Sequence, residues 1–192
     1  MDPELRGSEG PLNVAMVRSR YEILDRVIEA ADLLGHPHNP DYNGADQHGF
    51  HYYQVTQKNG VRHSAKKAYI DPVKSRPNLR IITRAQAMAL VMEGKRVTGV
   101  QVKTRKGIEV FTATQEVILS AGAIQSPQLL ELSGIGQPEH LSSLGIETRH
   151  AMKGVGEYMA DHYISRLSWK LNTDLSINHL SRGVGLVGEV IK

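Results

Sequence analysis

The sequence predicts a mixed α/β (α+β) fold, and three observations support this prediction. An amphipathic helical pattern covers residues 19–35. Three strand-like segments joined by tight turns cover residues 85–113. An apolar, strand-like run at 116–122 then leads directly into a second helical pattern. Helical and strand periods therefore alternate along the chain without an internal repeat, which is typical of domains that combine helices with sheets.

The composition is that of a globular protein and argues against several other classes of protein. The chain of 192 residues is long enough for one domain or two small ones, and its 40% hydrophobic and 22% charged residues are ordinary for a globular protein. No apolar run approaches ~20 residues, so no transmembrane segment is expected. The net charge of +3 is scattered, which argues against a nucleic-acid partner. The absence of cysteine excludes disulfides and fits a cytoplasmic location.

The first half of the chain alternates strands, helices and one long polar loop. In order, we expect a strand, a helix, the loop, a strand and a short helix over residues 10–17, 19–35, 36–49, 50–57 and 64–75. In the first helix Ile23, Val27 and Leu34 recur at helical spacing. Ser19 can cap its start and Gly35 can lie just past its end. Loops as long as 36–49 are often functional.

The second half is richer in strands. We expect strands at 79–83, 85–93, 96–104, 108–113, 116–122, 146–152 and 163–172, and short helices at 127–133 and 138–145. The turns at Gly94-Lys95 and Lys106-Gly107 make a β-meander of the three strands that they join. Residues 116–122 are apolar on both faces, which is typical of a fully buried strand. Ser126 is the expected N-cap of the helix that follows, with Pro127 at its first position.

The segment "SAGAIQSPQLLELSGIG" (120–136) places small residues between the end of a strand and the start of a helix. In open α/β sheets such a junction forms a crevice where nucleotides bind, and small residues let the backbone approach a flat ring or a ribose. Alternatively, the small residues only allow the helix to pack tightly on a sheet. The residues alone favour neither interpretation.

This segment resembles the second signature of the glucose–methanol–choline (GMC) family of FAD-dependent oxidoreductases. Gly122-Ala123, Ser126-Pro127, Leu129-Leu130 and Ser133-Gly134-Ile135-Gly136 all fit that signature. The segments beginning "DYNGADQHGF" and "SRPNLRIITR", and the segment "GVGEYMADH", also resemble parts of the family, so the resemblance covers nearly the whole chain. The chain is most similar to choline-dehydrogenase-like or alcohol dehydrogenase members. It departs from the family at Tyr158-Met159, where Asn-Leu is usual.

The resemblance implies a set of site residues. The cofactor FAD would be contacted by Ala87, Ser120, Ala121, Gly122, Asp161 and His162. The wall of the substrate cavity would include Gln47, Tyr53, Gln54 and Thr56. In this reading the backbone of Ala87 meets the adenine, and Ser120 to Gly122 line the adenosine.

The resemblance also implies the domain organisation and the reaction. Residues 78–160 would be part of the FAD-binding domain with its β-meander. Residues 1–77 and 161–192 would be parts of an antiparallel-sheet substrate domain. The parent enzyme would oxidise a small-molecule alcohol to an aldehyde or ketone by hydride transfer to FAD. The family's pyrophosphate-binding motif and catalytic histidine are expected outside this chain, so no residue here is assigned to catalysis and the chain alone is expected to be inactive.

The sequence allows three other interpretations. The motif "GVGLVG" (183–188) matches a dinucleotide-binding pattern but does not follow a strand, so we do not expect it to bind one. Nine histidines suggest metal binding, but only the pairs His36/His38 and His48/His51 are closely spaced, and no metal site is expected. The alternative to an enzyme fragment is a truncated, non-catalytic module that binds a ligand or assembles into a homo-oligomer.

Overall fold

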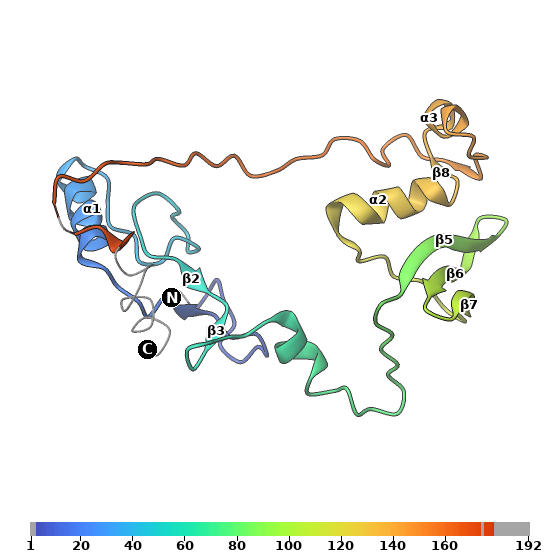
Figure 1. Cartoon of the computed structure of the whole chain (residues 1–192), viewed down its shortest axis with the longest axis horizontal. Coiled ribbons are helices and arrows are strands. Elements are labelled where there is room, and N and C mark those ends of the chain that lie inside the picture. The colour runs from blue at the N-terminus through green and yellow to red at the C-terminus, as the bar shows by residue number, and fades with distance from the viewer. Residues whose placement is uncertain (1–2, 174, 179–192) are drawn as a thin grey trace. The chain divides into compact units, whose positions relative to one another are not determined.

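The computed structural model describes residues 3–173 and 175–178, and the chain divides into two compact units (Figure 1). Unit 1 comprises residues 1–80 and 167–192, and unit 2 comprises residues 81–166. The motif at 183–188 lies outside the described residues. Across the described part of the chain, every helix is too short or too polar to cross a membrane. The assignment of the expected segments to FAD and substrate domains stays a prediction.

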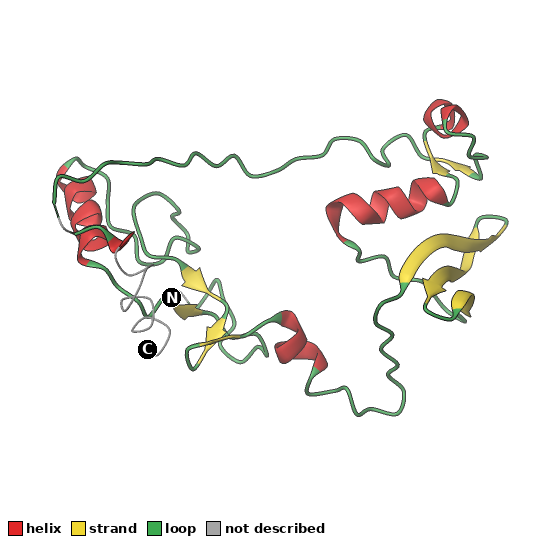
Figure 2. Cartoon of the chain, viewed as in Figure 1, coloured by secondary structure: helices red, strands yellow, loops and turns green. Residues whose placement is uncertain are grey.

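Unit 1 contains one long helix and several very short strands (Figure 2). Helix α1 (Glu22–Leu33) is followed by Gly35 with φ of +86°, which confirms the predicted end of this helix. Its start differs, because Tyr21 rather than Ser19 is the extended N-cap residue. Strand β1 (Ala15–Met16) pairs antiparallel with β2 (Gln54–Val55), so only parts of the expected strands 10–17 and 50–57 are paired.

A hairpin and one helical turn complete the main elements of unit 1. Strands β3 (Gln57–Lys58) and β4 (Val61–Arg62) are joined by Asn59-Gly60, and both loop residues have positive φ, as a tight primed turn requires. The expected helix at 64–75 is reduced to a π-helical turn, η1 (Lys66–Ile70). Pro72 follows it closely and has no N–H to continue a helix.

Unit 2 is built on the predicted β-meander. Strands β5 (Gln86–Glu93), β6 (Arg96–Thr104) and β7 (Gly107–Thr112) form an antiparallel sheet in the order β5-β6-β7. Gly94 has φ of +58° in the first turn of this sheet, which explains the choice of glycine there. The prediction of the meander is confirmed.

Helix α2 (Gly122–Leu132) packs against β5 and leads into a small parallel pair, β8 (Ile135–Gly136) and β9 (His150–Ala151), with α3 (Pro138–Ser143) between them. The buried residues of this core are Leu90, Leu129, Ile135 and Val155. Half-buried side chains that pack around them are Met92, Val97, Val117, Leu119 and Leu130. The second half of the signature segment is thus part of the core of unit 2.

Three expected strands are absent from the described residues. Residues 79–83, 116–121 and 163–172 have no regular structure, Gly122 begins α2, and Ile118 is 76% exposed instead of buried. A strand needs a neighbouring strand to pair with, and none of these segments is part of a strand pair among the described residues. The start of α2 also differs from the prediction. The helix begins at Gly122, so Ser126 and Pro127 lie inside it rather than at its N-cap and first position.

Candidate functional site

A cavity of about 520 Å³ lies between β5 and α2 in unit 2. Its lining residues are Ala85, Gln86, Ala87, Ala121, Gln125, Gln128, Leu129 and Leu132. Two of the residues predicted to contact FAD, Ala87 and Ala121, therefore meet at one cavity although they lie on different elements. Its volume falls within the usual range of small-molecule and cofactor sites.

The strand side of this cavity is shaped by an irregularity in β5. The pairing register between β5 and β6 shifts between Ala87 and Ala89. A bulge of this kind bends a strand and changes where its backbone groups point. Ala87 is exposed and has a small side chain, so it leaves room for a ligand beside the strand.

The helix side of the cavity is an uncapped helix N-terminus. Ala121 is the N-cap residue of α2 and provides no side-chain cap, so the first N–H groups of the helix are available to a polar ligand. Gly122 has φ of +95°, and no heavy atom lies within 4 Å of the position of a Cβ there. Ser120, Ala121 and Gly122 are all exposed, so they form an open turn rather than the end of a buried strand.

Ser126 supports this turn from within the helix. Its hydroxyl oxygen accepts a hydrogen bond of 3.0 Å from the backbone N–H of Ala121. Sequence reasoning assigned Ser126 to the N-cap, but the structure gives it the role of fixing the residue that precedes the helix. Pro127 lies inside α2, one residue later.

Ser133 joins the end of α2 to the sheet, a role that sequence reasoning missed. Its side chain is buried, and its oxygen accepts a hydrogen bond of 2.8 Å from the N–H of Leu90 while donating one of 2.6 Å to the carbonyl of Leu129. Leu90 lies on β5 and Leu129 on α2, so one hydroxyl connects both walls of the cavity. In the sequence, the only indication of this role is that a serine stands at this position of the signature segment.

A second cavity, of about 700 Å³, lies between α2 and residues 154–160. Ile124, Glu131 and Tyr158 are among the residues that line it. Tyr158 has φ of +57°, which is unusual for a bulky residue, and its side chain is 92% exposed. Asparagine tolerates this backbone conformation better than tyrosine does. The backbone at position 158 would therefore suit the asparagine that is usual in the family better than the tyrosine present here.

Asp161 and His162 follow this loop. Both are exposed, and the backbone N–H of His162 donates a hydrogen bond of 2.7 Å to Asp161 Oδ1. Neither residue lines the two cavities just described. The structure therefore does not bring them together with Ala87 and Ala121.

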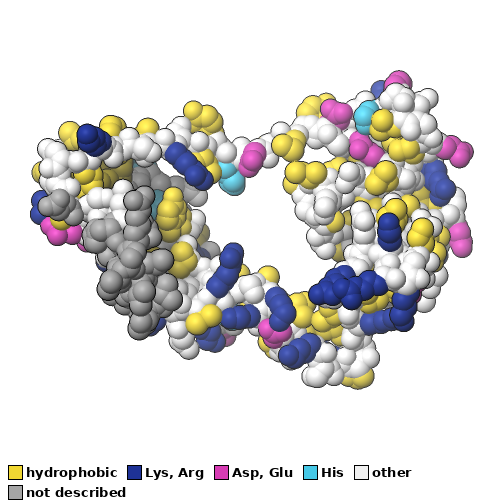
Figure 3. Space-filling view, in the orientation of Figure 1, with side chains coloured by type: hydrophobic (Ala, Val, Ile, Leu, Met, Phe, Trp, Pro, Cys, Tyr) yellow, Lys and Arg dark blue, Asp and Glu magenta, His cyan; other side chains and the backbone are white. Residues whose placement is uncertain are grey.

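Hydrophobic side chains elsewhere are visible at the surface of both units (Figure 3).

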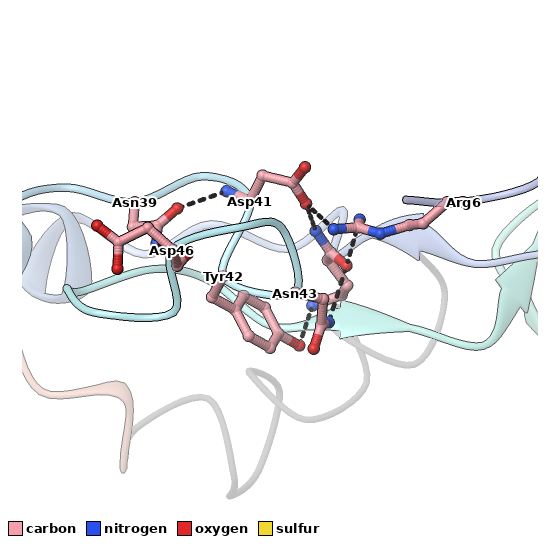
Figure 4. A network of polar contacts seen from close by, with 7 residues as sticks. Arg6, Asn39, Asp41, Tyr42, Asn43 and Asp46 are labelled. Atoms are coloured by element: carbon pink, nitrogen blue, oxygen red, sulfur yellow. Dashed lines mark hydrogen bonds and ion pairs between the residues drawn. The ribbon is translucent and has the colours of Figure 1, made fainter. Parts of the chain in front are cut away.

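Gln54 is the centre of a polar network in unit 1. Its side-chain amide donates to Asp41 Oδ1 (3.0 Å) and accepts from Asn43 (3.1 Å) and Arg6 (3.4 Å), while its backbone N–H donates to the hydroxyl of Tyr42 (3.1 Å). Figure 4 shows Arg6, Asp41, Tyr42 and Asn43 converging on this point. Arg6 and Asp41 also form an ion pair of 2.6 Å.

The other predicted substrate residues do not join this network. Gln47, Tyr53 and Thr56 are exposed, whereas Gln54 is half-buried and lines a cavity of about 590 Å³ together with Arg6. The structure thus brings Gln54 to a cavity in unit 1 and leaves the remaining three at the surface. Through its contacts with Asp41, Tyr42 and Asn43, Gln54 holds the loop at 39–46 against β2.

Two titratable side chains beside this loop have shifted pKa values. Burial lowers the pKa of His51 below 6.5, and the nearby His38 adds to the effect. The imidazole of His51 stacks on Tyr42 at 3.7 Å between ring centroids. Burial, together with a hydrogen bond to Asp25, raises the pKa of Tyr52. In the described part of the chain, no three or more His, Asp or Glu side chains gather in a way that would hold a metal ion.

The comparisons with known proteins agree on one family. The model of the GMC oxidoreductase family matches residues 1–164. The oxygen-dependent choline dehydrogenase of Staphylococcus saprophyticus is 44% identical over 161 residues, which are 84% of this chain and 29% of that protein. The chain therefore spans less than a third of the length of this relative.

Two solved structures also resemble the chain. Pyridoxine 4-oxidase from Mesorbium loti matches with a TM-score of 0.68 and 29% identity, over 77% of this chain and 29% of that one. An FAD-dependent oxidoreductase from Chaetomium thermophilum matches with a TM-score of 0.70 and 26% identity, over 80% and 27%. The family match and these oxidoreductases support FAD as the cofactor. The chain belongs to the GMC oxidoreductase family, and choline dehydrogenases are among its relatives.

Proposed function

We propose that this chain is the part of an FAD-dependent oxidoreductase that holds the adenosine portion of FAD. The observation that carries the proposal is the cavity at which Ala87 and Ala121 meet. Small side chains, an uncapped helix N-terminus and the open space above Gly122 suit a flat ring and a ribose. The residues present therefore fit this part of the cofactor.

The residues that would hold FAD are those at the two walls of the cavity. The backbone of Ala87 would contact the adenine, and Ser120, Ala121 and Gly122 would contact the adenosine. Asp161 and His162 are proposed to lie beside the cofactor in the whole protein. When bound, FAD supplies the acceptor for the hydride that leaves the alcohol.

The proposed substrate of the whole protein is a small alcohol, which is oxidised to an aldehyde or ketone. The similarity to an oxygen-dependent choline dehydrogenase supports an alcohol of the choline kind. Gln47, Tyr53, Gln54 and Thr56 are proposed to contribute to the substrate wall. We also propose a cytoplasmic location, on the basis of the lack of cysteine.

Retention of FAD tests the proposal directly. We expect the purified chain to show a flavin absorption spectrum after incubation with FAD and desalting. Substitution Ala121→Leu, which adds bulk to the wall of the cavity, should abolish this spectrum. Substitution Ala30→Leu makes the same change at an exposed position on α1 and should leave the spectrum intact. Equal retention by both variants, or no flavin in the unsubstituted chain, would contradict the proposed site.

We expect the chain alone to show no alcohol-dependent reduction of an electron-accepting dye. The physical reason is that nothing in it is assigned as the base that removes the hydroxyl proton, and alcohol oxidation requires one. The measurement is dye reduction by the FAD-loaded chain with choline as the substrate. Appreciable turnover would show that this part of the protein contains its own base.

A second candidate function is an oligomerising module. It is favoured by large apolar side chains at the surface, among them Ile118, Ile124 and Tyr163, since exposed apolar patches promote association. Sedimentation equilibrium distinguishes the candidates. A reversible assembly of fixed stoichiometry that does not depend on FAD favours the module, whereas a monomer that retains FAD favours the cofactor site.

A further inference from the structure

The positive charge of the chain is concentrated in one segment of unit 1, residues 58–80. This segment contains seven Lys or Arg residues and a single Asp, whereas the rest of the chain has 16 Lys or Arg residues against 19 Asp or Glu. Figure 3 shows Lys and Arg side chains close together over the stretch of chain that contains η1. The segment is therefore strongly basic, although the net charge of the whole chain is only +3.

Three lysines of this segment surround one carboxylate. Lys66 Nζ donates a hydrogen bond of 2.5 Å to Asp71 Oδ1. The pKa of Asp71 is lowered, mainly by this hydrogen bond and further by the positive charges of Lys66, Lys74 and Lys67. We refer to these three lysines as the lysine cluster. All three are exposed, and one carboxylate cannot neutralise three ammonium groups, so the cluster presents an excess of positive charge to the solvent.

Apolar side chains lie among the lysines. Residues 66–79 form η1 and a series of hydrogen-bonded turns that follow it. Ala68 is buried in the middle of η1, whereas its neighbours Tyr69 and Ile70 are 50% and 37% exposed. Basic and apolar side chains are thus exposed together within a few residues of one short element.

This combination favours one kind of partner. Lysine is depleted at protein–protein interfaces. Single-stranded nucleic acids are bound on several stacking aromatic side chains, and Tyr69 is the only Phe, Trp or Tyr in residues 58–80. A membrane surface with anionic lipids attracts lysines to its headgroups and accepts apolar side chains at the boundary with the acyl chains. Tyrosine is enriched at that depth.

We propose that the lysine cluster, together with Tyr69 and Ile70, binds the chain reversibly to the surface of membranes that contain anionic lipids. The ammonium groups contact lipid phosphates, and the two apolar side chains insert between the headgroups. The inference does not rest on the proposed function, because these residues belong to unit 1 and the cavity at Ala87 and Ala121 belongs to unit 2.

The test is co-sedimentation of the full chain with lipid vesicles. One set contains phosphatidylcholine alone, and the other contains equal parts of phosphatidylcholine and phosphatidylglycerol. We expect binding to the anionic vesicles at low salt and its loss at ~1 M salt, where charges are screened beyond ~3 Å. Equal binding to both sets of vesicles, or no binding to the anionic set, overturns the proposal.

Variants locate the surface that binds. Replacing the three residues of the lysine cluster by glutamine should weaken binding to anionic vesicles about a hundredfold, because each basic residue contributes about fivefold. The matched control replaces the exposed Lys95, Lys103 and Lys106 of unit 2 by glutamine and should bind nearly as tightly as the unsubstituted chain. Equal losses in the two triple variants would show that net charge, rather than the lysine cluster, is responsible.

Two single substitutions separate membrane binding from misfolding and from binding to any polyanion. Asp71→Asn removes the carboxylate beside the lysines and should tighten vesicle binding about fivefold, a gain that misfolding does not explain. Tyr69→Ser should weaken binding to vesicles and leave binding to heparin, a soluble polyanion, unchanged. Equal losses for vesicles and heparin would exclude insertion of Tyr69 and overturn the proposal.

A nucleic-acid partner and the FAD site are tested alongside. A chain that ignores anionic vesicles but binds a single-stranded RNA oligonucleotide through the lysine cluster would overturn the proposal in favour of nucleic acid. The triple variant of the lysine cluster should retain FAD as the unsubstituted chain does. Vesicle binding without FAD retention therefore supports the membrane surface and contradicts the proposed function, and the opposite result does the reverse.

Discussion

Single residues at the end of α2 determine how the helix meets the sheet. Ser133 connects Leu90 to Leu129 through its hydroxyl group. Gly134 follows with φ of +81°, and a Cβ there would lie 2.5 Å from the carbonyl oxygen of Glu147. Ser133 thus connects α2 to β5 through hydrogen bonds. Gly134 allows the segment that contains Glu147 to approach the end of the helix closely.

Substitution Gly134→Ala should destabilise the chain by about 2 kcal/mol or more. A left-handed backbone costs an alanine roughly 1–2 kcal/mol, and the contact with the carbonyl of Glu147 adds to that. Urea unfolding measures the difference. The control is Gly154→Ala, where an added Cβ meets nothing within 4 Å and the backbone is not left-handed. Equal stability of the two variants would contradict the assigned role of Gly134.

His51 should make unit 1 less stable in acid. Its pKa is lowered in the folded chain, mainly by burial, so the unfolded chain binds its proton first as the pH falls. Stability that is present above pH 6.5 is therefore lost as the pH falls below that value. Substitution His51→Phe keeps a ring on Tyr42 and should flatten the difference in thermal unfolding temperature between pH 7.5 and pH 5.5. The same dependence in both proteins would exclude His51 as its source.

At the scale of elements, the contact between α2 and β5 creates the candidate site. On this helix Leu129 is buried in the core, whereas the side chain of Leu132 is 51% exposed. The same helix presents Gln125 and Gln128 to the cavity. The rotation of α2 about its axis therefore determines both which of its side chains are buried and which line the cavity.

Substitution Leu129→Ala should cost about 2–5 kcal/mol, because it leaves a cavity beside Leu90 and Ile135. Substitution Leu132→Ala is the matched control on the same helix. Its side chain is 51% exposed, and a cost below about 1 kcal/mol is expected. Chemical unfolding of both variants gives the comparison. A larger loss for the control would mean that α2 is rotated relative to its described position.

The elements that the sequence predicted correctly depend on nearby residues. The meander and the C-terminal ends of α1 and α2 follow from alternation, tight turns and glycines, all of which act over a few residues. The strand expected at 116–122 required a partner that local patterns do not reveal, and it is absent. For the site, the resemblance placed Ala87 and Ala121 at a common ligand, and the structure brings them to one cavity. The contacts of Ser133 and Gln54 depend on residues distant in the chain, so no pattern indicated them.

At the scale of the whole molecule, the division into two units is the main feature. The segments near both boundaries, 76–85 and 157–171, have no regular structure, and Tyr163 and Trp169 within them are largely exposed. Each unit has its own hydrogen-bonded strands. Among the described residues, the two boundary segments are therefore expected to be accessible to a protease.

Limited digestion with trypsin should release unit 2 as a resistant fragment. Cleavage is expected after Arg80 or Arg84 and after Arg166 or Lys170, since these residues lie in the two boundary segments. Mass spectrometry of the early products identifies the ends. A first cleavage between β5 and β9 would contradict the description of unit 2 as a compact body.

The meander also has a consequence for how quickly unit 2 acquires its structure. β5, β6 and β7 are consecutive in the chain and joined by short turns, so their pairing closes only small loops. Such local contacts form early and fast during folding, whereas the parallel pair of β8 and β9 must wait for α3 to bring its strands together. Because β7 precedes α2 in the chain, we expect the sheet to pair before α2 is available during synthesis, so that the helix then folds onto a surface that already exists.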